Sequence, residues 1–420
     1  MKARLTVLWL LCGVGLAISP AEDLYVQSTQ TLQENYFGYS SRDLPALVQQ
    51  YGQQLQDTCK PQADNCPVEV GRSTLEALLN ELADPHTYYL YPEESDSRDR
   101  AQNGEDSPTP RIGVTSAPLP GGLGRVVLFV RDDGPAYTAG IKPGDLLVEV
   151  DGKPLGNDPS GGSNLIAEYA QKTTPFEMKV RRGKELLTFT LQGEVLMQAP
   201  LPTLTTGGGL PEGVGLIQIP DFEAYRQVGR KVHALVRQAR QQKLYALILD
   251  LRNNGGGLVI EWISAAAAFS PNPGVLNVRK DQTSRLEYRQ GTLQMRVNDE
   301  FAGNVYTIRM PELWTGKMVV LVNGETASSG EYFAYYLQKM GIKVIGEPTY
   351  GLLNTAADSY ELPDQGLLVV TTIKSALPDG TLYPERLTPD ILVNDDLSSR
   401  AGTLVDPLVR RALEELEYQP

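Results

Sequence analysis

One stretch of the chain, residues 318–341, most constrains what this sequence can fold into. It opens with the apolar run Met318–Val322, which is short and rich in β-branched residues and therefore predicts a buried strand. An Asn-Gly pair ends this strand, and Tyr332–Met340 predicts a helix that Gly341 closes in a left-handed cap. The chain must therefore pass through a tight strand-to-helix turn over residues 323–331.

Ser328 lies on this turn. A serine at such a place has its hydroxyl held clear of the sheet, beside backbone N–H groups that the helix cannot satisfy internally. Donors of this kind can hold an anion, which acyl transfer from a serine nucleophile requires. Ser328-x-x-Glu331 is also a capping box, in which the serine only satisfies an N–H. The local sequence leaves both interpretations open.

The N-terminus has the pattern of a secretory signal. Two basic residues precede an apolar run over residues 5–16, and the small residues Ser19 and Ala21 predict cleavage after Ala21. The run is too short for a comfortable membrane span, so residues 1–21 are expected to be a signal peptide, with an uncleaved anchor as the alternative. We expect a periplasmic or secreted protein with no stable membrane span after cleavage.

The acidic composition argues against nucleic acid as a partner. The whole chain has 38 basic and 51 acidic residues; without the two basic residues of the signal, 36 minus 51 gives a net charge of −15. Phosphate binding needs a basic face. The cysteines of the mature chain, Cys59 and Cys66, predict a disulfide in an oxidising compartment. Zinc is less favoured because no further cysteine or nearby histidine completes four ligands, and no cofactor or metal is expected.

Residues 22–92 predict a helical region. Apolar residues recur at helical spacing in two runs, which are Leu44, Val48, Tyr51 and Leu55, and then Leu75, Leu78, Leu79 and Leu82. Pro85 prevents the second helix from continuing, so His86 is expected in a loop just past its end. Residues 93–110 are charged and poor in apolar residues, and they predict a linker.

Residues 111–198 form a separate small module in the sequence. Its expected elements are strands at Arg125–Val130, Leu146–Val150, Phe176–Val180 and Leu186–Leu191, with a helix at Asn164–Ala170. Proline and glycine residues set turns between them in an order that resembles a PDZ domain of the circularly permuted bacterial kind. The resemblance implies capture of an extended peptide by strand addition, with its terminal carboxylate on backbone N–H groups of Ile112, Gly113 and Val114. The alternative is that the PDZ-like module serves only as a spacer in the chain.

Residues 199–420 alternate predicted strands with helices, which indicates an α/β layer. Strands are expected at Val214–Ile219, Tyr245–Leu251, Lys343–Ile345, Leu367–Thr372 and Ile391–Val393, and helices at Tyr225–Gln241, Val259–Phe269 and Leu404–Leu416. Asp250–Gly257 follows one strand and carries three glycines, which let backbone N–H groups point into open space. A phosphate loop is not favoured for this segment, because no Gly-Lys-Ser/Thr follows it. The remaining interpretations are an oxyanion hole and a plain glycine turn.

Together with the PDZ-like module, three motifs occur in order along the chain. They are Asp250-Leu251-Arg252-x-Asn254-x-Gly256-Gly257, Ala327-Ser328-Ser329-Gly330-Glu331 and Gly346-Glu347-Pro348-Thr349-Tyr350-Gly351. In this combination the chain resembles the tail-specific, or C-terminal processing, serine peptidases. The resemblance implies a multidomain α/β protein with a core of stacked ββα units, similar to the Clp protease and crotonase folds, and cleavage of proteins near their C-termini. It places the nucleophile on Ser328 and the oxyanion hole on the backbone N–H groups of Gly256 and Ser329.

The chain departs from this family at the general base. Most tail-specific peptidases pair the serine with a lysine directly after the third motif, and Leu352 occupies that position. Base assistance usually contributes about 10²–10⁴-fold to the rate, so another residue supplies it or the protein is not a peptidase. His86 is a candidate because tricorn-type relatives use a serine–histidine pair and histidine titrates near neutrality; a structural loop histidine is the alternative. His233 shares a helix with three arginines and is expected on its solvent-exposed face.

A third residue should orient the histidine. The tricorn-type site implies a glutamate ahead of a late Pro-Asp pair, and Glu385 is the nearest, with a plain surface glutamate as the alternative. Asn354 is a further candidate for substrate contact. The sequence thus predicts a periplasmic or secreted serine endopeptidase whose PDZ domain presents polypeptide tails. The alternative is a catalytically inactive PDZ scaffold with a degenerate peptidase core, because Leu352 stands where the lysine should be.

Overall fold

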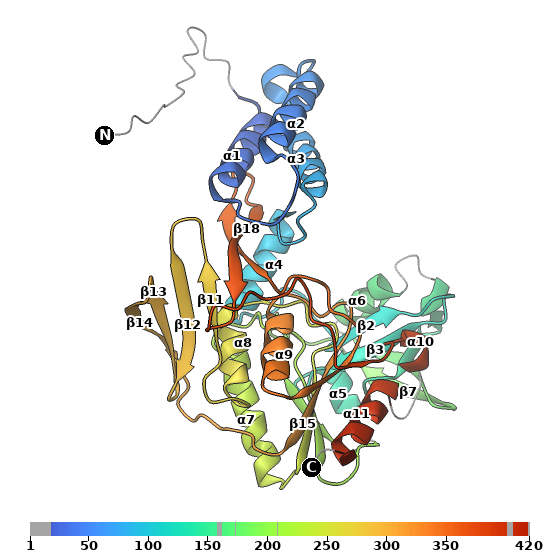
Figure 1. Ribbon diagram of the computed structural model, residues 1–420. Helices are drawn as coiled ribbons and strands as arrows, with labels where there is room; N and C mark the ends of the chain where they lie inside the picture. The colour runs from blue at the N-terminus through green and yellow to red at the C-terminus, as the bar shows by residue number, and fades with distance from the viewer. Residues whose placement is uncertain (1–17, 158–161, 173, 208, 401–405, 419–420) are drawn as a thin grey trace. The chain divides into compact units, whose positions relative to one another are not determined.

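The computed structural model describes residues 18–157, 162–172, 174–207, 209–400 and 406–418 (Figure 1). The chain divides into two compact units. The first unit extends to Glu93 and includes Ala357–Thr371, and the second holds Glu94–Ala356 and the residues from Thr372 onward. Most of the expected signal peptide, residues 1–17, lies outside the described residues. Within the described ranges, no helix combines the length and the apolar character that a membrane span needs.

Three helices form the core of the first unit. They are α1 (Pro20–Asn35), α2 (Leu44–Cys59) and α3 (Val68–Leu82), with a 3₁₀ turn over Ala63–Asn65. The leucines that the sequence placed at helical spacing are buried in one cluster, as expected for the apolar stripes of packed helices. The predicted disulfide between Cys59 and Cys66 closes the connection from α2 to α3.

The first unit also contains a small antiparallel pairing. Ala83 ends α3 in a left-handed conformation, and the turn after it carries His86, as predicted. β1 (Tyr88–Leu90) then pairs with the first three residues of β18 (Leu367–Ala376). β17 (Thr355–Glu361) pairs with β18 as well, and both of these strands have residues in each unit.

Helix α4 (Pro92–Asn103) occupies most of the segment that was expected to be a linker over residues 93–110, so that prediction is wrong. Proline suits the first position of a helix, and the side chains of Asp96 and Arg100 form an ion pair across one turn at 2.9 Å. Only Ser95 and Ala101 of this helix are buried. The sequence therefore carries no apolar periodicity that could have indicated the helix.

The PDZ-like module is an antiparallel sheet with strand order β2-β3-β4-β6-β7, and β5 pairs with β4. Its elements are β2 (Val114–Pro118), β3 (Arg125–Val130), α5 (Pro135–Ala139), β4 (Leu146–Val150), β5 (Lys153–Pro154), a 3₁₀ turn (Leu155–Asn157), α6 (Ser163–Gln171), β6 (Phe176–Arg182) and β7 (Glu185–Leu191). The four predicted strands and the predicted helix are confirmed to within two residues at each end. Among the described strands, β2 is an edge of this sheet.

A six-stranded sheet with order β19-β16-β15-β10-β9-β8 carries the rest of the second unit. Its neighbouring strands are parallel except for β8 with β9. The strands are β8 (Thr203–Thr206), β9 (Val214–Gln218), β10 (Ala246–Asp250), β15 (Lys317–Val322), β16 (Lys343–Gly346) and β19 (Ile391–Leu392). The helices are α7 (Val228–Gln241), α8 (Val259–Ala266), α9 (Ser329–Lys339), α10 (Leu397–Arg400) and α11 (Pro407–Tyr418).

Alternate residues of the central strands face two apolar clusters. Leu249 of β10 packs with residues of α7, α8 and α9, whereas Ile248 packs with residues of α11. The sheet thus has helices on both faces, which agrees with the predicted α/β class. Asp250 pairs with Leu321 at the ends of the neighbouring parallel strands β10 and β15. The turns that follow these two strands therefore leave the sheet at the same edge.

One antiparallel region was not predicted. It consists of β11 (Gly274–Val278), β12 (Thr283–Arg289), β13 (Thr292–Val297) and β14 (Glu300–Thr307), which pair in sequence order. The last three residues of β18 pair with Leu276–Val278 of β11. β12 and β13 do alternate polar with apolar residues, namely Leu286 and Tyr288 in β12 and Leu293, Met295 and Val297 in β13, but this pattern was not interpreted as strands.

Candidate active site

Ser328 lies immediately before α9, on the turn that follows β15. Its backbone has φ 49° and ψ −119°, which a non-glycine residue rarely adopts and which costs of order 1–3 kcal/mol. Neighbouring groups hold this turn: the Ala327 N–H donates to the Asn254 carbonyl at 2.8 Å, and the Ser328 N–H donates to the Glu331 carboxylate at 2.8 Å. Ser328 itself is half-buried. The structure thus has the predicted serine on a strand-to-helix turn.

The glycine turn after β10 lies against Ser328. Gly256 has φ +107°, and a Cβ atom added to it would lie 2.8 Å from the Ser328 Cβ and 3.1 Å from the Ser329 nitrogen, so only glycine fits. Ser329 is the first residue of α9, and its N–H belongs to the group that a helix leaves without an internal acceptor. The Gly256 N–H donates to Asn254 Oδ1 at 2.9 Å. The structure therefore brings the two predicted oxyanion residues together, while donation by Gly256 to a substrate stays a prediction.

Asn254 fixes the glycine turn, and this role was not predicted from the sequence. The residue is fully buried, and its Nδ2 donates to the Ile219 carbonyl at 2.9 Å. Its Oδ1 holds Gly256, and its backbone carbonyl holds Ala327. One residue thus connects the glycine turn to the residue that follows β9 and, through its backbone, to the residue before the serine.

Asp221 is a titratable group beside the glycine turn that the sequence also did not single out. The N–H of the next residue, Phe222, donates to the Gly256 carbonyl at 2.7 Å. Burial raises the pKa of Asp221 to about 7, even though the Glu223 N–H donates to its carboxylate at 2.9 Å. Asp221 therefore titrates in the same range as an unperturbed histidine.

Glu331 joins the turn over residues 323–331, called the nucleophile turn because it carries Ser328, to the loop over residues 349–352. The carboxylate is fully buried, and its Oε2 accepts the N–H groups of Ser328 at 2.8 Å and Leu352 at 2.7 Å. Its Oε1 accepts the Gly351 N–H at 3.0 Å and the Thr349 hydroxyl. Burial raises the pKa of Glu331, and these donors oppose the rise. The glutamate of the expected capping box therefore holds a second, distant segment as well.

Leu352 lies beside the nucleophile turn, because its N–H shares the Glu331 Oε2 atom with the Ser328 N–H. The residue is 9% exposed. The position where the resemblance expects a lysine is thus next to the serine, and here it carries a side chain that cannot accept a proton.

Glu385 lies close to the same loop. A Cβ atom on Gly351 would be 3.4 Å from Glu385 Oε1, and the Leu353 N–H donates to the Glu385 carbonyl at 3.0 Å. The Glu385 side chain is 67% exposed and pairs with Arg386 at 3.1 Å, which fits the surface alternative. Asn354 follows in this loop, and its carbonyl accepts the Ser375 N–H at 3.0 Å. The orienting role of Glu385 stays a prediction, as does substrate contact by Asn354.

His86 belongs to the first unit and is buried, with 7% exposure. Its backbone N–H donates to Asp84 Oδ1 at 3.0 Å. Asp84 also accepts the hydroxyls of Tyr36 at 2.7 Å and Thr371 at 3.0 Å, so the turn that carries His86 is firmly held. Ser328 belongs to the second unit, and the pairing of the two residues stays a prediction.

His233 is buried rather than solvent-exposed, so the prediction for it is wrong. It lies on α7 in line with Gly229 and Val236, which are buried too. Its Nδ1 accepts the Glu312 N–H at 2.8 Å and its Nε2 donates to the Ser264 carbonyl at 3.1 Å, and burial lowers its pKa. Both ring nitrogens are used by the fold. In the described part of the chain, no group of three or more His, Cys, Asp or Glu side chains is placed to hold a metal ion.

A cavity of about 520 Å³ lies in the PDZ-like module, between β2 and α6. The predicted peptide-binding residues Ile112, Gly113 and Val114 line it, together with apolar residues of α6 such as Ile166 and Ala170. The structure thus brings these three residues to a groove along an edge strand.

Family models match the two parts of the second unit. Residues 213–393 match the model of peptidase family S41, and residues 126–182 match the model of a PDZ domain. Residues 213–393 therefore form a peptidase S41 domain. Within the S41 domain lie both turns that meet at Ser328, and Leu352 is part of it as well.

The chain is similar in sequence to two CtpA-like serine proteases and in fold to one solved structure. A CtpA-like serine protease of Staphylococcus haemolyticus strain JCSC1435 is 23% identical over 325 residues, which cover 77% of this chain and 60% of that protein. Another, of Staphylococcus aureus strain bovine RF122 / ET3-1, is 25% identical over 330 residues, which cover 78% and 60%. The chain spans 60% of the length of these two relatives. The crystal structure of an S41 protease from Bacteroides fragilis NCTC 9343 shares the fold at 15% identity, with a TM-score of 0.57 and coverage of 93% and 97%.

Proposed function

We propose that the protein is a serine peptidase in which Ser328 is the nucleophile. The observation that carries this proposal is the contact between the strained serine turn and the backbone of Gly256, inside an S41 domain. Two backbone segments with donors at a serine hydroxyl are what acyl transfer needs, because charge develops on the carbonyl oxygen. A fixed nucleophile in this setting also removes part of the entropic cost of reaction.

In the proposed reaction the Ser328 hydroxyl oxygen bonds to the carbonyl carbon of a peptide bond and loses its proton to a base. The N–H groups of Ser329 and Gly256 stabilise the oxyanion. The carbon–nitrogen bond then breaks, the proton goes to the leaving amine, and water hydrolyses the acyl-enzyme by the same steps. For Gly256 to donate, its N–H must leave or share its bond with Asn254 Oδ1.

We propose His86 as the base, with Glu385 as its orienting partner. The support is chemical: Leu352 cannot accept a proton, and both ring nitrogens of His233 are already bonded to backbone groups. Histidine suits this task because the unperturbed pKa of its side chain is about 6.5.

We propose polypeptide tails as substrates, captured by the PDZ domain before cleavage. Support comes from the groove between β2 and α6, since an extended peptide can add its backbone to an edge strand. We further propose that the protein works outside the cytoplasm, after cleavage near Ala21. The signal-like N-terminus and the Cys59–Cys66 disulfide support this location.

The direct test is hydrolysis of an unfolded protein such as reduced casein. The intact chain is expected to cleave it, and Ser328→Ala is expected to reduce cleavage to background. Ser73→Ala is a matched control, because Ser73 is an exposed helix residue whose hydroxyl donates only to the Glu69 carbonyl. Equal cleavage by the wild type and Ser328→Ala would reject the proposal.

A second function is favoured by one observation, the leucine at position 352. A chain without an effective base would bind peptides without turnover and act as a scaffold. Binding of a tail peptide with no hydrolysis, and no reaction of Ser328 with a fluorophosphonate, would support this function over the peptidase.

A further inference from the structure

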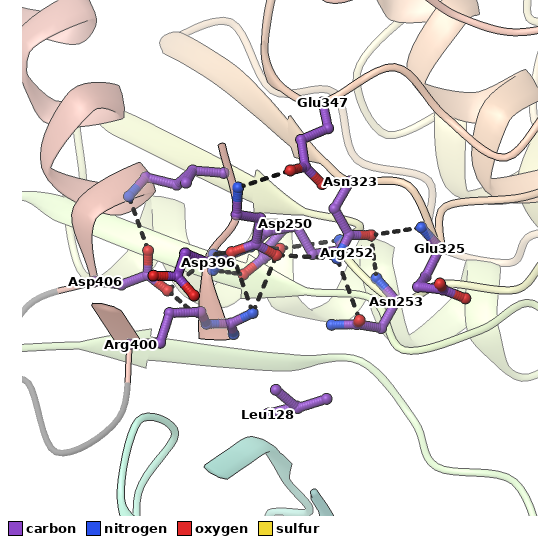
Figure 2. Close-up of polar contacts among 12 residues, drawn as sticks. Leu128, Asp250, Arg252, Asn253, Asn323, Glu325, Glu347, Asp396, Arg400 and Asp406 are labelled. Carbon is purple, nitrogen blue, oxygen red and sulfur yellow. Dashed lines mark hydrogen bonds and ion pairs between the residues drawn. The ribbon is translucent and has the colours of Figure 1, made fainter. Parts of the chain in front are cut away.

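A buried cluster of charges lies at the ends of β10 and β15 (Figure 2). Arg252 is at its centre, and its side chain is 3% exposed. Its Nε donates to Asp250 Oδ1 at 2.9 Å and its Nη2 donates to Asp250 Oδ2 at 2.7 Å, so the two form a bidentate pair. Asp250 and Arg252 of the Asp-Leu-Arg motif therefore form the centre of this cluster.

The other members come from the C-terminal segment. Arg252 Nη1 also donates to Asp406 at 2.8 Å and to Asp395 at 3.2 Å. Arg400 pairs with the same two carboxylates, at 3.1 Å and 3.3 Å. The side chains of Asp395 and Arg400 are 2% and 4% exposed. These partners lie beyond residue 393, where the match to the S41 family model ends.

Asn323 connects this cluster to both turns of the site, as Figure 2 shows. Its Nδ2 donates to Asp395 Oδ2 at 2.9 Å and to Asn253 Oδ1 at 3.2 Å. Its Oδ1 accepts the Asn253 N–H at 2.9 Å and the Glu325 N–H at 3.2 Å. Asn253 begins the glycine turn, and Asn323 begins the nucleophile turn.

We propose that Asp395 is a positioning residue that fixes the glycine turn relative to Ser328 by orienting Asn323. This inference rests on the proposed peptidase function. A side-chain amide has two orientations related by a flip, and a strong acceptor on its NH₂ group, together with the N–H donors that face its oxygen, selects one of them. The carboxylate of Asp395, itself held by Arg252 and Arg400, is that acceptor. With the amide fixed, its oxygen faces the two N–H groups and ties the turns together.

Small displacements at this point have large consequences. Gly256 is three residues after Asn253, and Ser328 is five residues after Asn323. Misplacement of reacting groups by about 1 Å can lower a rate about 10²-fold, so loosening this bridge should lower kcat. Substrate binding in the PDZ groove involves none of these residues, so KM should change little.

The test compares Asp395→Asn with Asp396→Asn in the full chain. Asp395→Asn leaves the carboxylates of Asp250 and Asp406 for two guanidinium groups, so no cation is left without a partner and folding is expected. Asp396 is an exposed neighbour whose carboxylate is bonded to Ser398 and Ser399, and asparagine is an equally good residue before a helix. Asp395→Asn is expected to lower kcat about 10- to 100-fold with KM within about twofold, and Asp396→Asn is expected to match the wild type.

Amide hydrogen exchange provides a readout that needs no turnover. Peptides covering residues 253–257 and 323–330 should exchange faster in Asp395→Asn and unchanged in Asp396→Asn. Asn323→Ala removes the bridge while keeping every ion pair, and it should reproduce both effects. Wild-type exchange in both turns, or a kcat loss no larger than the unfolded fraction seen by circular dichroism, would overturn the proposal. Failure of the proposed function shows separately, as a wild type no more active than Ser328→Ala.

Discussion

Replacing Glu331 with glutamine tests whether its carboxylate joins the nucleophile turn to the loop over residues 349–352. The carboxylate accepts four donors, two on each oxygen. An amide has one oxygen, which can stay with the N–H groups of Ser328 and Leu352. Its NH₂ group then faces the Thr349 hydroxyl, which can turn to accept, and the Gly351 N–H, which cannot.

The magnitude follows from this count. Glu331→Gln leaves one buried N–H without an acceptor, which costs about 1–3 kcal/mol, and removal of a buried charge offsets part of that cost. We expect a net loss of about 1–2 kcal/mol in the free energy of unfolding. Glu331→Ala would leave four donors unsatisfied, at about 4–12 kcal/mol, which approaches the whole stability of a typical domain. Glutamine is therefore the informative substitution.

Urea denaturation measures the stability of Glu331→Gln, and hydrolysis of a fluorogenic peptide measures its kcat. The loop at position 352 should loosen, so kcat is expected to fall about 10-fold or more. Glu325→Gln is the matched control, because this exposed glutamate lies on the same turn and a surface change usually stays within about 0.5 kcal/mol. If Glu331→Gln matched this control in both stability and kcat, the assigned role of the carboxylate would be refuted.

The remaining predictions concern the base and the response to acid. In a fluorogenic peptide assay, His86→Ala is expected to lower kcat about 10²–10⁴-fold, and adding Leu352→Lys should recover part of the loss. Full activity of His86→Ala would mean that another residue is the base. The limb of the pH–rate profile near neutrality should vanish in His86→Ala and persist in Asp221→Asn, whereas the reverse result would assign that limb to Asp221. Burial raises the pKa of Asp406, but two arginines outweigh it and hold the pKa below its usual value. Its stabilising contribution is therefore complete above the unfolded-state pKa of about 3.9 and is lost as the pH falls through the lower folded-state pKa. Asp406→Asn should flatten the loss of stability below about pH 4 in urea titrations, and an unchanged slope would contradict this assignment.

The central sheet could be predicted from the sequence because its signals are local. β10 and β15 are continuous apolar runs that end in polar turns, and α7 has a clear apolar stripe. α4 lacked such a signal, because only two of its residues are buried. The strands β11–β14 carry weaker signals, since they are short and place only a few residues each in the apolar core.

The site shows the same limit. The turns that carry Ser328 and Gly256 could be predicted because each has a recognisable local pattern, while their catalytic roles stay predictions. The partners that fix those turns could not, since Asn323 meets Asn253 across 70 residues and Asp395 meets Arg252 across 143. His233 was predicted to be solvent-exposed because arginines flank it on its helix. The Ser264 carbonyl and the Glu312 N–H that bind its ring can be identified only in the folded structure.

The most direct test of the account is the reaction of Ser328 with a fluorophosphonate, followed by intact mass and peptide mapping. Folded wild-type protein is predicted to gain one adduct on Ser328, and Ser328→Ala is predicted to gain none. A folded protein that forms no adduct at Ser328, or forms its adduct on another residue, would contradict the claim that this serine is an activated nucleophile.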